Sequence, residues 1–214
     1  MRDRSATPRA RTGAALVALS AALGLTIQFG VTVQDSGSPA LALWTLSRFF
    51  TIWTNLLVAL VFAAIALGVR VQARIIGGLL LSILLVGIVY GLLLRGIQVH
   101  AGAGIVANAL LHQATPMAVP LWWMLFVVKG DLRRSDPWMW ALYPLSYFAV
   151  ALVRGAMEGR YPYFFLDIAR FGAGRVALNA LLIGLSFVAA GYAVLWLDRR
   201  LSRRRLPISA AWRC

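Results

Sequence analysis

The side chains of this sequence whose types and surroundings could support nucleophilic chemistry are His112 and a threonine of the preceding apolar segment, Thr51 or Thr54. A threonine hydroxyl is a poor nucleophile until a base removes its proton, and a neutral histidine about 2.6–3.2 Å away is the usual base. His112 lies in the apolar run 105–128, where a bilayer makes an imidazole costly unless it has partners or a function. The first hypothesis is therefore a catalytic threonine and histidine dyad.

The helix expected around His112 carries further polar groups. Asn108 lies four residues before His112 and Thr115 three residues after it, so the three side chains should share one face. Pro116 lacks the N–H that would bond the carbonyl of His112, so the helix should be kinked or loosened at the histidine.

A second polar face is expected on the preceding apolar segment. Arg48, Thr51 and Asn55 are spaced by three and four residues, and Thr54 lies beside them. At about 1.5 Å per residue, Thr51 lies about 28 Å and His112 about 25 Å from the inner boundary. Thr54 gives about 24 Å, so the count does not distinguish the two threonines.

The supporting roles at such a dyad stay open. Asn108 could hold the imidazole, or Asn55 could stabilise an oxyanion. A second interpretation is purely structural, because asparagine, threonine and histidine often hydrogen-bond helices together in membrane bundles. The residues alone favour this structural interpretation.

Acidic residues are few and peripheral. None of the seven lies in the middle of an expected span, and the only cysteine is the last residue, Cys214. This distribution argues against a di-metal carboxylate site, a paired-carboxylate glycosidase or a relay built on acids. We expect neither a metal nor a cofactor.

The composition places the chain among integral membrane proteins. Hydrophobic residues make up 61% of the 214 positions and charged residues only 13%, with a mean hydropathy of +0.78. Six segments approach the length that a helix needs to cross a bilayer. They are 13–33, 49–69, 75–94, 105–128, 138–153 and 172–197. We expect an all-α protein whose single domain, 1–214, is a six-helix transmembrane bundle with short basic tails at about 1–12 and 198–214.

The net charge of +14 is explained by topology and not by nucleic acid. Fifteen of the 21 basic residues fall on the side that holds both tails, and six fall on the other. This asymmetry predicts that both termini are cytoplasmic. The cluster 199–205 is expected to contact anionic lipid headgroups. The sequence does not indicate an oligomeric state.

The N-terminal segment has a rival interpretation as a secretory signal cleaved near Ala42. Its apolar stretch of about 20 residues exceeds the 7–15 of a signal core, which favours a retained first span.

The last span carries a third, weaker polar face. Arg175 and Asn179 lie four residues apart near its outer end. On the fifth span Tyr143 and Tyr147 are also four apart, and they could either bond to the polar faces or only pack.

The motifs together resemble a known family. They are Arg48-Phe-Phe-Thr51, Asn108-x-x-x-His112 with a proline after it, and Tyr161-Pro-Tyr-x-Phe-x-Asp167. In order and spacing, this combination resembles the androgen-induced and androgen-dependent membrane hydrolases and their bacterial six-span relatives. The animal members have a pair of threonines after the histidine, where this chain has Gln113 and Ala114.

The resemblance implies a hydrolase of fatty acid esters of hydroxy fatty acids in a bacterial cytoplasmic membrane. It places the nucleophile at Thr51, ahead of Thr54, and the base at His112. Arg48 or Arg175 would then bind a substrate carboxylate. The alternatives are a small transporter or lipid-binding protein whose polar faces line a passage, and a bundle without a ligand.

Overall fold

The computed structural model describes residues 7–97 and 101–203 and is built from helices, with no strand among these residues. The long helices are α1 (Pro8–Ser36), α3 (Phe50–Ala66), α4 (Ala73–Val89), α6 (Thr115–Phe126), α7 (Asp136–Glu158) and α8 (Ile168–Arg203). Shorter elements are α2 (Pro39–Leu46), α5 (Ala103–Ala109), the π-helical turns η1 (Tyr90–Leu94) and η2 (Leu110–Ala114), and the 3₁₀ turn η3 (Phe164–Leu166).

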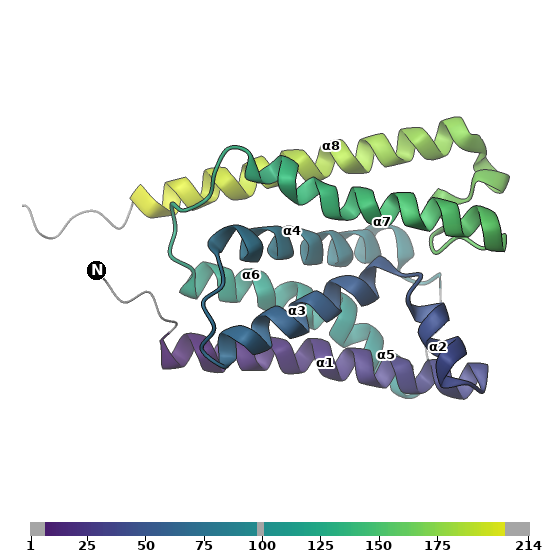
Figure 1. Cartoon of the computed structure of the whole chain (residues 1–214), viewed down its shortest axis with the longest axis horizontal. Coiled ribbons are helices and arrows are strands. Elements are labelled where there is room, and N and C mark those ends of the chain that lie inside the picture. The colour runs from purple at the N-terminus through teal and green to yellow at the C-terminus, as the bar shows by residue number, and fades with distance from the viewer. Residues whose placement is uncertain (1–6, 98–100, 204–214) are drawn as a thin grey trace, which may run out of the picture.

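Six long helical paths run back and forth along the molecule (Figure 1). The start of α1 lies at the same end as the close of α3, because the Arg11 side chain donates to the carbonyl of Ala66 at 2.9 Å. Trp122 of α6 reaches the same end and donates to the carbonyl of Ala10 at 2.9 Å. The start of α1, the end of α3 and the end of α6 therefore lie at one end of the bundle.

The segment before Thr51 departs from the expected single helix. Ser38 caps α2, since its hydroxyl accepts from the N–H of Leu41. However, α2 ends at Leu46, and α3 leaves at a bend of 97°. Arg48 lies within this break. The expectation that Arg48 shares a helical face with Thr51 and Asn55 is therefore wrong.

The helix around His112 is loosened as predicted. The elements α5, η2 and α6 follow one another without a gap, and His112 lies in the π turn η2. A π turn directs backbone bonds from residue i to i+5, and a missing N–H such as that of Pro116 favours such an offset. A second π turn, η1, directly follows α4 and begins at Tyr90.

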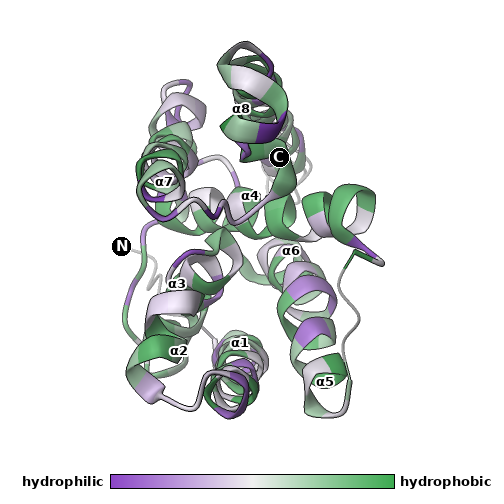
Figure 2. Ribbon diagram, turned by 90° about the vertical axis from the view of Figure 1, so that its right-hand side faces the viewer, coloured by the Kyte–Doolittle hydropathy of each residue, from purple (hydrophilic) through white to green (hydrophobic). Residues whose placement is uncertain are grey.

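Within residues 7–97 and 101–203, three helices are long and apolar enough to cross a membrane, or four if the bent pair α2 and α3 forms one span. Hydrophobic residues recur along the helices, as the colouring by residue hydropathy shows (Figure 2). Each helical path carries large apolar side chains that are more than half exposed, such as Leu16, Leu60, Ile88, Met117, Val150 and Leu181. Such surfaces are unfavourable in water and favourable in lipid, which is consistent with an integral membrane protein. Six crossings remain a prediction.

Candidate active site

Thr51 and His112 meet between α3 and η2. The hydroxyl of Thr51 lies 3.3 Å from Nε2 of His112. Thr51 is in the first turn of α3 and is only 7% exposed, while His112 is half-buried. Two residues 61 positions apart are therefore held in proximity by the packing of two helices.

The other ring nitrogen of His112 determines what Nε2 can do. Nδ1 lies 3.3 Å from the carbonyl oxygen of Asn108, and a carbonyl only accepts. A neutral imidazole in this position carries its proton on Nδ1, which leaves Nε2 as the acceptor facing Thr51. The backbone of Asn108 thus orients the ring, whereas the sequence suggested its side chain as one possibility.

The ring of His112 is further held by Tyr90. The two rings are stacked, with centroids 4.4 Å apart and planes inclined by 27°. The amide of Asn108 donates to the hydroxyl of Tyr90 at 2.6 Å. These contacts with Tyr90 of η1 restrict the rotation of the imidazole ring.

Asn55 connects the two halves of the site. Its fully buried amide donates to the carbonyl of Thr51 at 2.9 Å and to that of Leu111 at 3.2 Å. In the π register the carbonyl of Leu111 would require an N–H from Pro116, which has none. Asn55 supplies that missing donor, so its evident role is to hold η2 against α3.

Thr54 and Thr115 have other partners. The hydroxyl of Thr54 lies 3.1 Å from that of Tyr143, and the hydroxyl of Thr115 lies 2.9 Å from that of Ser20 on α1. The geometry therefore distinguishes Thr51 from Thr54. The expectation that Thr115 shares the face of His112 is wrong, because the π turn changes the angular spacing after the histidine.

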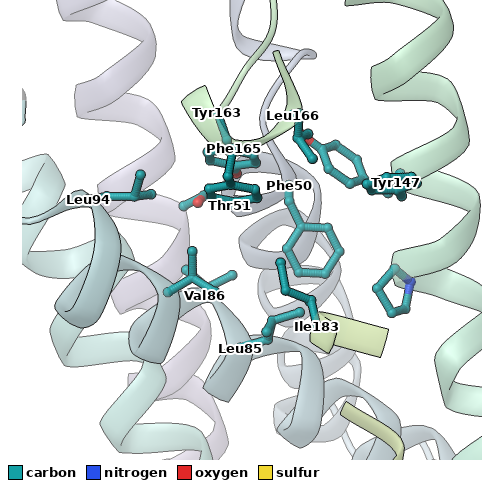
Figure 3. A pocket seen from close by; sticks show the side chains of 13 residues that line it. Phe50, Thr51, Leu85, Val86, Leu94, Tyr147, Tyr163, Phe165, Leu166 and Ile183 are labelled. Carbon is teal, nitrogen blue, oxygen red and sulfur yellow. The ribbon is translucent and has the colours of Figure 1, made fainter. Parts of the chain in front are cut away.

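A pocket opens beside Thr51 (Figure 3). Its cavity volume is about 80 Å³, and the empty space reaches about 550 Å³ when the open solvent at its mouth is included. Its walls come from α3, α4, η1, α7, α8 and the segment around η3, and they are largely aliphatic and aromatic. The hydroxyl-bearing residues among them are Thr51, Tyr147 and Tyr163. The pocket is apolar, and His112 is not among the residues that line it.

Arg48 is already paired. It forms an ion pair with Glu158, which also binds Arg154 at 2.6 Å. Hydrogen bonds from Arg154, together with the two positive charges, hold the pKa of the Glu158 carboxyl below its usual value. This pairing weakens the case for Arg48 as a clamp for a substrate carboxylate.

Arg154 ties α2 to α7. Its guanidinium donates to the Ser47 hydroxyl at 2.8 Å and to the carbonyl of Trp44 at 2.6 Å. It also lies 3.9 Å from the centre of the Trp44 ring. These bonds hold the bend that precedes Thr51.

The two residues of the third polar face, Arg175 and Asn179, have different surroundings. Asn179 donates to the carbonyl of Phe165 at 3.0 Å and so fixes the segment that roofs the pocket. Arg175 is exposed, and no ion pair within the described part of the chain involves it. Of the two arginines proposed for a carboxylate, Arg175 is therefore the one with an uncompensated charge.

Sequence reasoning missed three participants. Tyr90 lies between Gly87 and Gly91, a spacing that indicates helix packing. Tyr163 belongs to an aromatic stretch that is typical of a membrane interface. Glu158 follows Arg154 by four residues, and that spacing could have indicated an ion pair.

Comparison of the chain with models of known protein families, with curated proteins and with solved structures gives no match. Across the described residues, no three histidine, cysteine, aspartate or glutamate side chains come together as a metal site would require.

Proposed function

We propose that this chain is an integral membrane hydrolase of lipid esters that uses Thr51 as nucleophile and His112 as general base. The observation that carries the proposal is the pair of contacts made by the imidazole. Nδ1 lies beside the carbonyl of Asn108 and Nε2 beside the hydroxyl of Thr51. This arrangement gives the acceptor nitrogen to the nucleophile, as acyl transfer requires.

The reaction follows from this arrangement. The Thr51 oxygen attacks the ester carbonyl while Nε2 of His112 takes the hydroxyl proton. The tetrahedral intermediate collapses, and the same proton passes from Nε2 to the departing alkoxide, which leaves as an alcohol. Water then attacks the acyl-threonine, with His112 acting again as base, and releases a carboxylic acid.

The substrate class is supported by the pocket. Its aliphatic and aromatic walls suit an acyl chain, and the Thr51 hydroxyl is one of its few polar groups. We place the ester carbonyl at Thr51 with its acyl chain along α4, α7 and α8. For an ester that also bears a carboxylate, exposed Arg175 is the preferred partner, since Arg48 is paired with Glu158.

The proposal includes a topology of six spans with both termini in the cytoplasm. It is supported by the six alternating helical paths and by the basic residues that gather at one end. With this orientation the pocket faces the outer leaflet of a bacterial cytoplasmic membrane, and a lipid would enter sideways from the bilayer.

The apolar pocket also favours a second candidate, a lipid-binding protein or small transporter without catalysis. In that case the polar groups around Thr51 would only hold a ligand headgroup.

An alkyl fluorophosphonate distinguishes the two candidates. We expect it to label the purified chain in detergent, and Thr51→Ala and His112→Ala to abolish labelling. Thr54→Ala is the matched control, because Thr54 bonds Tyr143 and not His112. Absence of labelling in the wild-type chain, or labelling that survives Thr51→Ala, would favour the second candidate.

A further inference from the structure

The aromatic segment before α8 forms the roof of the pocket over Thr51. Tyr163 and Phe165 stack with ring centroids 5.3 Å apart and nearly parallel planes. Figure 3 shows both rings among the side chains that line the pocket, together with Thr51 and Tyr147.

Few hydroxyl groups in this pocket could donate a hydrogen bond to a developing oxyanion. The Thr51 proton is the one that moves to His112. The Tyr147 hydroxyl already donates to the carbonyl of Arg48 at 2.7 Å. Among the hydroxyls of the pocket wall, Tyr163 is the one left to donate to a ligand.

The break between α2 and α3 places the N-terminus of α3 next to Thr51, where it can help to stabilise a negative charge. Phe49 caps α3 without a side-chain hydrogen bond, so the first N–H groups of this helix have no side-chain partner at the cap. The ring of Tyr163 lies at this helix start, because it packs edge-on against Phe49 with centroids 6.3 Å apart. A negative charge there would also meet the positive end of the helix dipole.

We propose that Tyr163 is a catalytic residue that donates a hydrogen bond to the oxyanion formed at Thr51. The inference rests on the proposed hydrolase function. When Thr51 attacks, the electron pair of the carbonyl bond moves to oxygen, and the Tyr163 hydroxyl stabilises that charge without losing its proton. The first N–H groups of α3 complement it.

The protonation state of Tyr163 fits this role. The residue lies in the loop between α7 and α8, and burial raises the pKa of its phenol above the usual value of 10.0. The phenol therefore remains a donor throughout the pH range in which the protein would work.

Tyr163→Phe tests the proposal, because it retains the stacked ring and removes only the hydroxyl. With a short p-nitrophenyl ester, we expect kcat to fall about 100-fold to 1,000-fold while KM stays within about threefold of the wild-type value. The affinity for a trifluoromethyl ketone, which forms a tetrahedral adduct, should fall with kcat. Tyr143→Phe is the matched control, since its hydroxyl bonds Thr54 away from the pocket wall.

The outcomes separate this inference from the function on which it rests. If the wild-type chain neither turns over the ester nor forms the adduct, the proposed function fails and this inference with it. If the wild-type chain reacts through Thr51 while Tyr163→Phe keeps a kcat within threefold, only the role of Tyr163 is overturned. The same holds if Tyr143→Phe lowers kcat as much as Tyr163→Phe.

Discussion

Replacing Asn55 by leucine perturbs the fold at the point that holds the dyad together. The change retains the volume of a fully buried side chain and removes the donor to the carbonyls of Thr51 and Leu111. The Thr51 carbonyl keeps a backbone hydrogen bond within α3. The Leu111 carbonyl has no such backbone donor, because the residue in that position is Pro116, which has no N–H. One buried carbonyl is therefore left unsatisfied, which costs about 1–3 kcal/mol.

The membrane environment lowers the free-energy cost of this unsatisfied carbonyl. Hydrogen bonds between helices in bilayers average about 0.6 kcal/mol, so we expect a loss of about 1 kcal/mol in the free energy of unfolding. For a chain of this size that corresponds to a fall of about 2–4 °C in the unfolding midpoint. The fluorophosphonate labelling rate should fall as well, because η2 is no longer fixed against α3.

The assay is thermal unfolding in detergent, followed by tryptophan fluorescence. Ser82→Ala is the matched control, because this buried hydroxyl donates at 2.9 Å to Gly78 within its own helix. The reasoning is refuted if Asn55→Leu unfolds within one degree of the wild-type chain, or if the Ser82 control falls equally far.

Three further predictions concern packing, charge and topology. Gly87→Ala should lower both the labelling rate and the stability, since the new Cβ would lie 2.9 Å from the Cβ of Pro116. Gly91→Ala is the control and should lower neither, because no atom lies within 4 Å of its new Cβ. Equal effects of the two substitutions would contradict the close packing at Gly87. The pKa of Glu158 is lowered on folding, so its stabilisation is present above the unfolded value of 4.5 and is lost as pH falls through the folded value. Glu158→Gln should therefore show a smaller loss of melting temperature on acidification, and an unchanged acid limb would be inconsistent with the ion pairs. Reporters fused after Arg134 and at the C-terminus should be cytoplasmic and one near Arg160 external, whereas any other pattern rejects the six-span topology.

The similar depth of Thr51 and His112 was predictable because helical rise is nearly constant, but the same count fits Thr54, and the choice of Thr51 came from the family resemblance. Depth measured from charged boundaries therefore carries over to the folded chain. The loosening at His112 was predictable for a similar local reason, the missing N–H of Pro116.

The break before Thr51 was not predictable, because no proline or glycine occupies Ser47, Arg48 or Phe49. It is held by bonds from Arg154, more than 100 residues away in the chain. The pairing of Arg48 with Glu158 is equally distant. Helical spacing also failed for Thr115, because it assumes a regular helix and the π turn adds a residue.

Mass spectrometry of the acyl-enzyme tests the central claim most directly. The chain is quenched during turnover of a slow p-nitrophenyl ester, digested and mapped. We predict one acyl group on the peptide that contains Thr51, with fragmentation assigning it to that residue, and none in Thr51→Ala or His112→Ala. Turnover with the acyl group on another residue, or with no covalent adduct under any quench, would contradict the account.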